Sequence, residues 1–204
     1  MTDHYYSRHP ESESDPKEWS CSLRGMSFVF QTDRGVFSKG GVDFGSRLLI
    51  ETFREPDVDG PILDVGCGYG PIGLALAKSY PGRDIHLIDV NERALHLASE
   101  NAEKNGIFNV KIYESDRLAQ VEVRDFAAIV TNPPIRAGKQ IVFRILEESY
   151  DHLRAGGELW VVVQKKQGAP SVKNRMEEIF RQVEMVERKK GYHILMAKKG
   201  DEEA

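Results

Sequence analysis

The chain has 204 residues, 40% of them hydrophobic and 29% charged, which is typical of one globular domain with a full core. It contains no apolar run near the roughly 20 residues of a membrane-spanning helix, and its polar first ten residues do not resemble a signal peptide. Cys21 and Cys67 lie far apart without metal-ligand spacing, so we expect no disulfide framework, no metal site and a cytoplasmic protein.

The net charge of −4 argues against a protein that coats nucleic acid by charge alone. Basic clusters nevertheless occur late in the chain, at Lys165-Lys166, at Arg188-Lys189-Lys190 and at Lys198-Lys199. Such clusters occur on ordinary solvated surfaces as well as at ligand-binding sites, so the composition does not identify a substrate.

The first part of the chain is expected to extend an otherwise regular domain. Residues 1–22 are rich in Ser, Glu and Pro, which predicts a draped or mobile N-terminal arm. The segment SFVFQTD (27–33) alternates in hydrophobicity and RGVF (34–37) follows a tight turn, which predicts a β-hairpin. Apolar residues at helical spacing between 43 and 53 then predict a helix.

From residue 61 onward, strand and helix patterns alternate. Strands are expected at 61–66, 84–90, 109–115, 126–132, 158–164, 182–188 and 192–199, and helices at 71–80, 91–106, 140–157 and 171–180. This order predicts a Rossmann-like α/β fold, with helices on both faces of a seven-stranded, mostly parallel sheet that contains one antiparallel strand. We expect one domain over residues 23–200, followed by an acidic tail at 201–204.

A glycine-rich turn lies between the first of these strands and its helix, in LDVGCGYGPIG (63–73). Glycines allow positive φ and close approach of the backbone to a ligand. Asp89 ends the next strand, where its carboxylate can accept hydrogen bonds from ribose hydroxyls. A tight turn and a helix-capping acid remain the alternative for the glycines alone, so the pattern favours a nucleoside site without proving one.

A nicotinamide enzyme is a second alternative, because Gly68, Gly70 and Gly73 also form the dinucleotide pattern G-x-G-x-x-G. Two features argue against it. Asp64 precedes the loop, and a carboxylate there suits an ammonium group rather than a pyrophosphate. The sequence Asn-Pro-Pro after the fourth strand, at 132–134, has no evident use in hydride transfer.

The apolar strand at 126–132 ends in Asn132, Pro133, Pro134 and Ile135. Each proline lacks a backbone donor and fixes φ, so the strand must stop and hold the Asn132 carboxamide in a rigid turn.

Together these segments resemble the class I S-adenosylmethionine-dependent methyltransferases. LDVGCGYG is similar to their glycine motif, LIDVN to their ribose-binding segment and ESD (114–116) to their adenine loop, while NPPI resembles the motif of enzymes that methylate planar nitrogens. The resemblance implies S-adenosylmethionine as cofactor and a pocket at the carboxyl ends of the first, second and fourth strands. The implied cofactor-binding residues are Phe37, Asp43, Asp64, Gly66, Cys67, Gly68, Gly70, Asp89, Val90, Asn91, Asp116 and Asn132.

The segment GVFSKGGVDFGSRLLIETF (35–53), with HYYSRHP (4–10), narrows the resemblance to the catalytic half of RsmC-like small-subunit ribosomal RNA guanine-N2 methyltransferases. Longer members carry a second, degenerate domain, so this chain is expected to be a single-domain member. RNA contact must then come from self-association as a homodimer, from the arm, or from basic patches. We expect contacts from Lys165, Lys166, Arg188, Lys189 and Lys190, with Arg136 and Lys139 near the base.

The resemblance also implies the chemistry of the catalytic turn. The lone pair of an exocyclic amine is delocalised into its ring, and acceptors at the Asn132 oxygen and the Pro133 carbonyl orient it towards the methyl donor. The target base must leave its stack to reach them. Ile135 stands where many members carry an aromatic ring, which would stack the base at roughly 1–3 kcal/mol.

We therefore expect methyl transfer to guanine N2 in small-subunit ribosomal RNA. Two alternatives stay open. A protein glutamine also offers a planar nitrogen, and an RNA-binding assembly factor could keep the fold without turnover.

Overall fold

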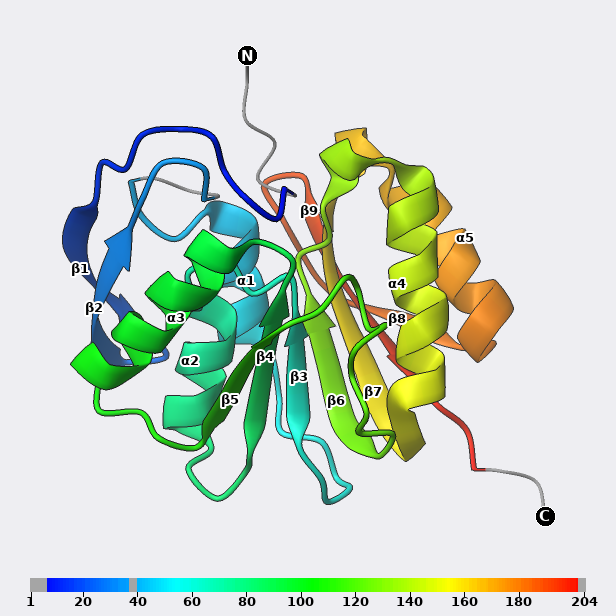
Figure 1. The fold of residues 1–204 in the computed structure, drawn as a ribbon. Coiled ribbons are helices and arrows are strands. Elements are labelled where there is room, and N and C mark those ends of the chain that lie inside the picture. The colour runs from blue at the N-terminus through cyan, green and yellow to red at the C-terminus, as the bar shows by residue number, and fades with distance from the viewer. Residues whose placement is uncertain (1–6, 37–39, 202–204) are drawn as a thin grey trace.

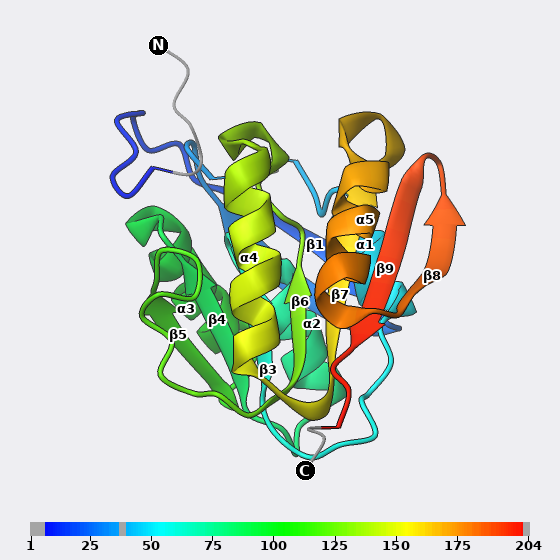
Figure 2. The ribbon, with the colours of Figure 1, turned by 90° about the vertical axis from the view of Figure 1, so that its right-hand side faces the viewer.

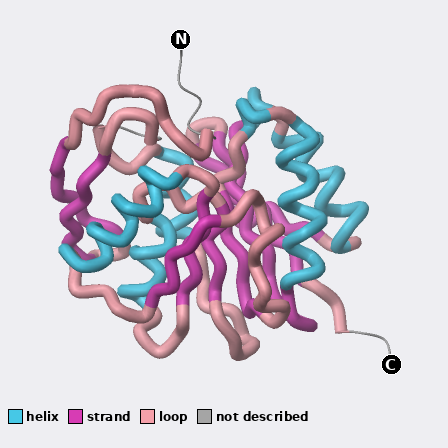
Figure 3. The backbone as a smooth tube through the Cα atoms, viewed as in Figure 1, coloured by secondary structure: helices cyan, strands magenta, loops and turns pink. Residues whose placement is uncertain are grey.

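The computed structural model describes residues 7–36 and 40–201. A central sheet separates two groups of helices, and a small hairpin packs beside one of them (Figure 1). Figure 3 shows the same layers, with the strands running between the helices. In the described residues, no helix is both long and apolar enough to cross a membrane.

The sheet has seven strands in the order β5-β4-β3-β6-β7-β9-β8, and β9 alone runs in the direction opposite to the other six. The strands are β3 (Ile62–Val65), β4 (Ile85–Asp89), β5 (Val110–Glu114), β6 (Phe126–Thr131), β7 (Leu153–Gln164), β8 (Val183–Lys189) and β9 (Tyr192–Lys198). The helices are α1 (Phe44–Thr52), α2 (Pro71–Ser79), α3 (Glu92–Lys104), α4 (Lys139–His152) and α5 (Ala169–Phe180), with short 3₁₀ turns η1 (Ile135–Ala137) and η2 (Lys165–Gln167). The predicted fold class is confirmed.

The neighbouring strands β3 and β6 are buried along their whole length, which explains why their sequences are largely apolar. They pair in parallel with Val65 opposite Thr131, and the Thr131 hydroxyl donates to the Val65 carbonyl over 3.0 Å. This pairing brings the glycine-rich turn after β3 next to Asn132 after β6.

The helices cover both faces of the sheet. One hydrophobic core lies between the sheet and α1, α2, α3 and the hairpin, and a second lies beneath α4 and α5. Figure 2 shows α4 and α5 side by side on that second face, with β9 and β8 at the edge of the sheet. Pro71 and Asn91 begin α2 and α3 as predicted, since proline suits the first turn and the Asn91 side chain accepts the Ala94 N–H.

The predicted hairpin exists, but its second strand was wrongly placed. β2 (Met26–Thr32) pairs with the preceding strand β1 (Lys17–Leu23) through a turn at Arg24-Gly25, and not with residues after Asp33. Residues 34–36 do not pair with β2, because the other edge of β2 is occupied by the side chains of one residue in α3 and of the residue that follows it. Asn101 and Asn105 bond the amides and carbonyls of Gln31 and Val29.

The prediction of one helix over 140–157 was also wrong at its end. α4 stops at His152, and the glycine pair lies inside β7. A Cβ on Gly157 would lie 2.8 Å from the Phe126 carbonyl oxygen, beside the irregular register between β6 and β7. The glycines therefore allow a bulge in a strand, and do not cap a helix.

The fully buried Asn101 generates a prediction about stability. Its side chain satisfies the N–H and C=O of Gln31 and also donates to the Tyr69 carbonyl in the glycine-rich turn. Asn101→Ala should lower the free energy of unfolding by about 3 kcal/mol, because buried backbone groups lose their partners. Urea denaturation measures this, with Ser99→Ala on the exposed face of α3 as the control. Equal losses in both variants would contradict the assignment.

Candidate active site

A cavity of about 300 Å³ opens at the edge of the sheet where the parallel strands β3, β4, β6 and β7 end and β9 begins. Most of the site residues expected from the sequence line it: Asp43, Gly66, Cys67, Gly68, Asp89, Val90, Asn91, Asn132, Pro133, Pro134 and Ile135. The described residues contain no group of three or more His, Cys, Asp or Glu side chains that could hold a metal ion.

The glycine-rich turn presents bare backbone to this cavity. Gly66 and Gly68 have φ of 73° and 57°, and a Cβ on either would meet no atom within 4 Å. The N–H groups of Gly66 and Cys67 both donate to the Ile88 carbonyl at 2.9 Å, and that of Gly68 donates to Asp89 at 2.8 Å. These three donors are consumed by β4 and are therefore not available to a pyrophosphate.

Asp64 lies beneath the turn and is not part of the cavity wall. Its Oδ2 atom accepts the Gly73 N–H at 2.9 Å, and its buried Oδ1 atom has no hydrogen-bond partner among the described residues. Burial raises the pKa of Asp64 to about 7, the Gly73 N–H opposes this rise and the Asp89 charge adds to it. The unpartnered oxygen suits a cationic group, and the role of Asp64 towards an ammonium stays a prediction.

Asp89 stands at the carboxyl end of β4 with both oxygens fixed. Oδ2 accepts the Gly68 N–H and Oδ1 accepts the Asn91 N–H, at 2.8 and 2.9 Å. Burial raises the pKa of this carboxyl, while the backbone N–H groups oppose the shift. Each oxygen keeps lone pairs for further donors, which is what a ribose diol supplies.

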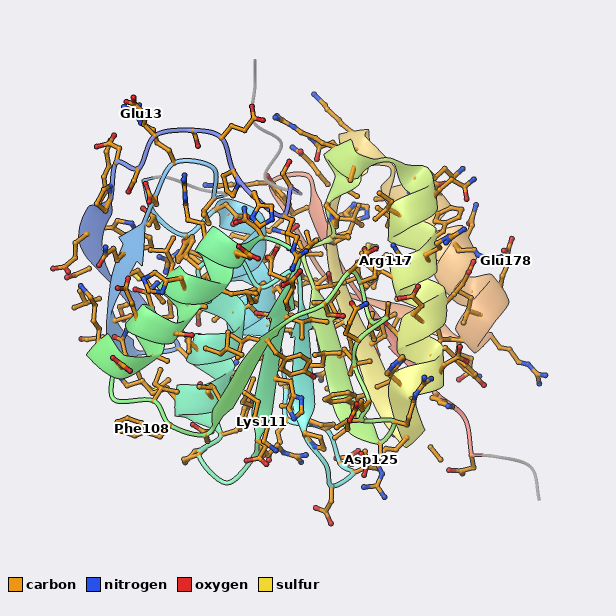
Figure 4. All side chains as sticks on the ribbon, in the orientation of Figure 1. Glu13, Phe108, Lys111, Arg117, Asp125 and Glu178 are labelled. Atoms are coloured by element: carbon orange, nitrogen blue, oxygen red, sulfur yellow. The ribbon has the colours of Figure 1, made fainter. Side chains whose placement is uncertain are left out.

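Two further predicted residues do not line the cavity. Gly70 precedes α2 with φ of 101°, and a Cβ there would lie 2.9 Å from Leu74, so its glycine serves packing. Asp116 is exposed and pairs with Arg117 at 2.9 Å, while Arg117 and Ser115 line the cavity. Figure 4 labels Arg117 beside α4. Phe37 lies outside the described residues.

The N-terminal segment borders the same end of the cavity. Arg8 forms ion pairs with Glu114 at 2.8 Å and Glu92 at 3.4 Å, which ties it to the end of β5 and the start of α3. β1 begins at Lys17, inside the predicted arm of residues 1–22. The division of the chain at residue 22 stays a prediction.

Asn132 is held by two residues from the start of α1. Its Nδ2 atom donates to the Ser46 hydroxyl at 3.0 Å and to Asp43 Oδ2 at 3.3 Å. The same Asp43 oxygen caps α1 by accepting the Ser46 N–H at 3.0 Å. Because both partners take the amide nitrogen, the Asn132 Oδ1 atom is left as the acceptor.

The two prolines after Asn132 restrict the backbone that holds its side-chain oxygen. The Pro133 carbonyl accepts the Ile135 N–H at 2.8 Å in a tight turn, and the Pro134 carbonyl accepts the Ala137 N–H at 2.9 Å in η1. The Pro133 oxygen keeps a second lone pair, so it can still accept an N–H from a substrate amine.

Among the cavity-lining residues that the sequence did not single out are Ser46, Gln164, Gln167 and Tyr192. Only Ser46 had a signal, since it follows the capping Asp43 by three residues. The others reach the site because β7 and β9 pair at the sheet edge, a contact that no local pattern specifies.

The basic clusters at 165–166 and 188–190 come together in the fold. The Lys165 N–H donates to the Gly191 carbonyl at 2.7 Å, which places η2 against the turn between β8 and β9. All five side chains of these clusters are exposed, next to the cavity-lining residues Gln167 and Tyr192. Arg136 lines the cavity itself, whereas Lys198 lies at the other end of β9.

Comparisons with known proteins agree on one family. The model of the methyltransferase small domain matches residues 27–196. The uncharacterized protein YbxB of Bacillus subtilis is 60% identical over 98% of this chain and 100% of its own length. Ribosomal RNA small subunit methyltransferase C of Vibrio cholerae is 30% identical, over 90% of this chain and 53% of that protein.

Among solved structures, the chain is similar to RsmC of T. thermophilus, a 16S rRNA N2 methyltransferase in complex with AdoMet and guanosine. The TM-score is 0.80 and the identity is 27%, over 92% of this chain and 51% of that one. The chain thus spans about half the length of the ribosomal RNA methyltransferases it matches.

The buried Asp64 gives a pH prediction. Its folded pKa of about 7 lies above the ordinary 3.8, so its contribution to stability is full below about pH 4 and is lost as pH rises through 7. Asp64→Asn keeps an acceptor for the Gly73 N–H without ionising. Relative to this variant, the wild type should lose up to about 1.4 kcal/mol of unfolding free energy per pH unit between pH 5 and 7. Urea titrations measure it, with exposed Asp84→Asn as the control; parallel profiles for Asp64→Asn and the wild type would refute the shift.

Proposed function

Because the chain belongs to the methyltransferase small domain family, we propose that it transfers a methyl group to the 2-amino group of a guanine in small-subunit ribosomal RNA. The observation that carries the proposal is the orientation of Asn132, whose amide nitrogen is held by Ser46 and Asp43 so that its oxygen is the acceptor at the cavity.

The cofactor of this family is S-adenosylmethionine, and the residues present fit it. Asp89 offers acceptors for the ribose hydroxyls, and the side-chain-free turn at Gly66 and Gly68 admits close contact. Asp64 keeps an unpartnered buried oxygen near this end of the site. When bound, the cofactor supplies an electrophilic methyl group on a sulfonium.

Asn132 then acts on the acceptor amine. Its Oδ1 atom and the Pro133 carbonyl accept N–H bonds from the amine, which directs the lone pair towards the methyl group and stabilises the charge that develops on nitrogen. Asp43 and Ser46 keep the amide from turning its nitrogen to the substrate. As the N–CH₃ bond forms and the S–CH₃ bond breaks, the methylated nitrogen must lose a proton. Asn132 is a hydrogen-bond acceptor here and not a base, because a carboxamide takes up no proton near neutral pH, so this proton passes to water.

An RNA substrate is supported by the named relatives and by charge. The net charge of −4 is unevenly spread, since the clusters at 165–166 and 188–190 meet beside the cavity. Basic groups at the rim attract a phosphate backbone, and they position it without reading sequence. We propose these clusters, with Arg136 and Lys139, as the RNA contacts, and a homodimer as a way to enlarge them.

The cofactor assignment gives one prediction. Asp89→Ala should weaken S-adenosylmethionine binding by roughly 1.5–3 kcal/mol, because hydrogen bonds to a charged group are lost. Calorimetry measures the affinity, and circular dichroism checks that the variant is folded. Asp84→Ala, at the opposite end of β4, is the matched control and should bind as the wild type does. Equal affinity in the two variants would remove Asp89 from the site.

The identity of the methylated base can be tested with small subunits or naked RNA from a strain that lacks the gene. Tritiated methyl is transferred to this substrate, and the labelled nucleosides are then analysed. Label should appear in N2-methylguanosine. Asn132→Ala should lower single-turnover transfer by roughly a hundredfold or more, as for loss of one preorganised transition-state contact, with little change in cofactor affinity.

Other outcomes separate the alternatives. Label in protein glutamine, or in adenine, would overturn the substrate while leaving methyl transfer in place. Cofactor binding without any transfer would favour the non-catalytic assembly factor. If Asn132→Ala transfers methyl at nearly the wild-type rate, Asn132 only forms the turn and has no catalytic role.

A further inference from the structure

The strand order places the groups of the cavity in sequence along one edge. Asp89 ends β4, the glycine-rich turn follows β3, Asn132 follows β6, Gln164 ends β7 and Tyr192 begins β9. Neighbouring strands lie about 4.8 Å apart, so two steps from β6 reach β9, about 10 Å away. If the cofactor binds on the side of Asn132 where β3 and β4 end, the base that accepts the methyl group must bind on the side of β7 and β9.

Tyr192 is the aromatic residue on that side. Its ring packs against α1, so closely that a Cβ on Gly45 would lie 2.8 Å from the ring, and the Phe44 ring lies 5.5 Å away. The side chain stays partly exposed and lines the cavity. Tyr69, the other tyrosine among the described lining residues, is 2% exposed and packs edge-on against Trp19 and Phe30 in the core.

Gln164 lies directly opposite Tyr192 in the antiparallel pair of β7 and β9. Opposite residues project from the same face of a sheet, so the amide and the ring are neighbours. Gln167, from η2, lines the same part of the cavity. Neither glutamine side chain has a hydrogen-bond partner in the part of the chain that the structure describes. Each therefore offers a free donor and a free acceptor to a ligand.

We propose that Tyr192 is the stacking surface for the acceptor base and that Gln164 and Gln167 bond its Watson–Crick edge beside the amine held by Asn132. This assignment rests on the proposed function. A guanine presents N1–H and O6 next to its 2-amino group, and a carboxamide matches them with its oxygen and its nitrogen. Tyr192 thereby supplies the aromatic face that Ile135 does not.

Four variants test the stacking surface in methyl transfer to RNA. Tyr192→Ala should lower kcat/KM by about tenfold to a hundredfold, the effect of losing one base–aromatic stack. Tyr192→Phe should stay within threefold of the wild type, whereas Tyr192→Leu, which keeps apolar bulk against Gly45, should fall with Tyr192→Ala. S-adenosylmethionine affinity should not change. Phe108→Ala, an aromatic deletion at an 82% exposed side chain at the opposite edge (Figure 4), is the control.

Competing nucleosides test the edge contacts. Guanosine and inosine share N1–H and O6, and adenosine has neither, so both should inhibit wild-type transfer more strongly than adenosine. Gln164→Ala combined with Gln167→Ala should abolish this preference, and exposed Gln182→Ala should retain it.

The outcomes distinguish the two proposals. If the wild type methylates RNA and Tyr192→Leu is as active as Tyr192→Phe, the ring is a packing residue and the stacking assignment is wrong. If the glutamine double variant still prefers guanosine and inosine, the edge assignment is wrong. If the wild type transfers no methyl to RNA, the proposed function and this assignment both fall.

Discussion

The parallel pairing of β3 with β6 determines where every other part of the site stands. Each strand is buried along its whole length, and Val65 and Thr131 are linked both by register and by the Thr131 hydroxyl. The ligand-facing turn and the Asn132 amide are simply the next residues of each strand. Both faces of each strand pack in the core, so a shift in register would disrupt packing on both faces. It would also move the glycine-rich turn away from Asn132.

A second constraint comes from hydrogen bonds that do two tasks at once. One oxygen of Asp43 caps α1 and also holds Asn132, so the helix that buries the sheet orients the acceptor amide. In the same way, Asp89 fixes the turn through Gly68 while keeping lone pairs for a ligand. The turn shares its glycine pattern with dinucleotide-binding proteins, but the N–H groups of Gly66, Cys67 and Gly68 donate to β4 and are not available to a phosphate.

Sequence patterns predicted what depends on neighbours in the chain. The central strands, the starts of α2 and α3 and the strand-ending prolines all have local causes, and all were found. The strand that pairs with β2 was predicted wrongly. The other edge of β2 is covered by the side chains of Asn101 and Asn105, and a hydrophobic pattern gives no sign of such a contact. Tyr192 and Gln164 were overlooked because they meet the site only through pairing between strands about thirty residues apart in the chain.

The amide side chains that hold β2 also have a consequence for folding during synthesis. The hairpin of residues 17–32 leaves the ribosome before α3, so Val29 and Gln31 have no partners until residues 76 and 70 positions further along have been made. Until α3 has emerged, the outer edge of β2 is an open template for another chain. Asn101 and Asn105 then cover that edge, and Asn101 also bonds the Tyr69 carbonyl, so the glycine-rich turn gains this contact only when β2 is protected from pairing with another chain.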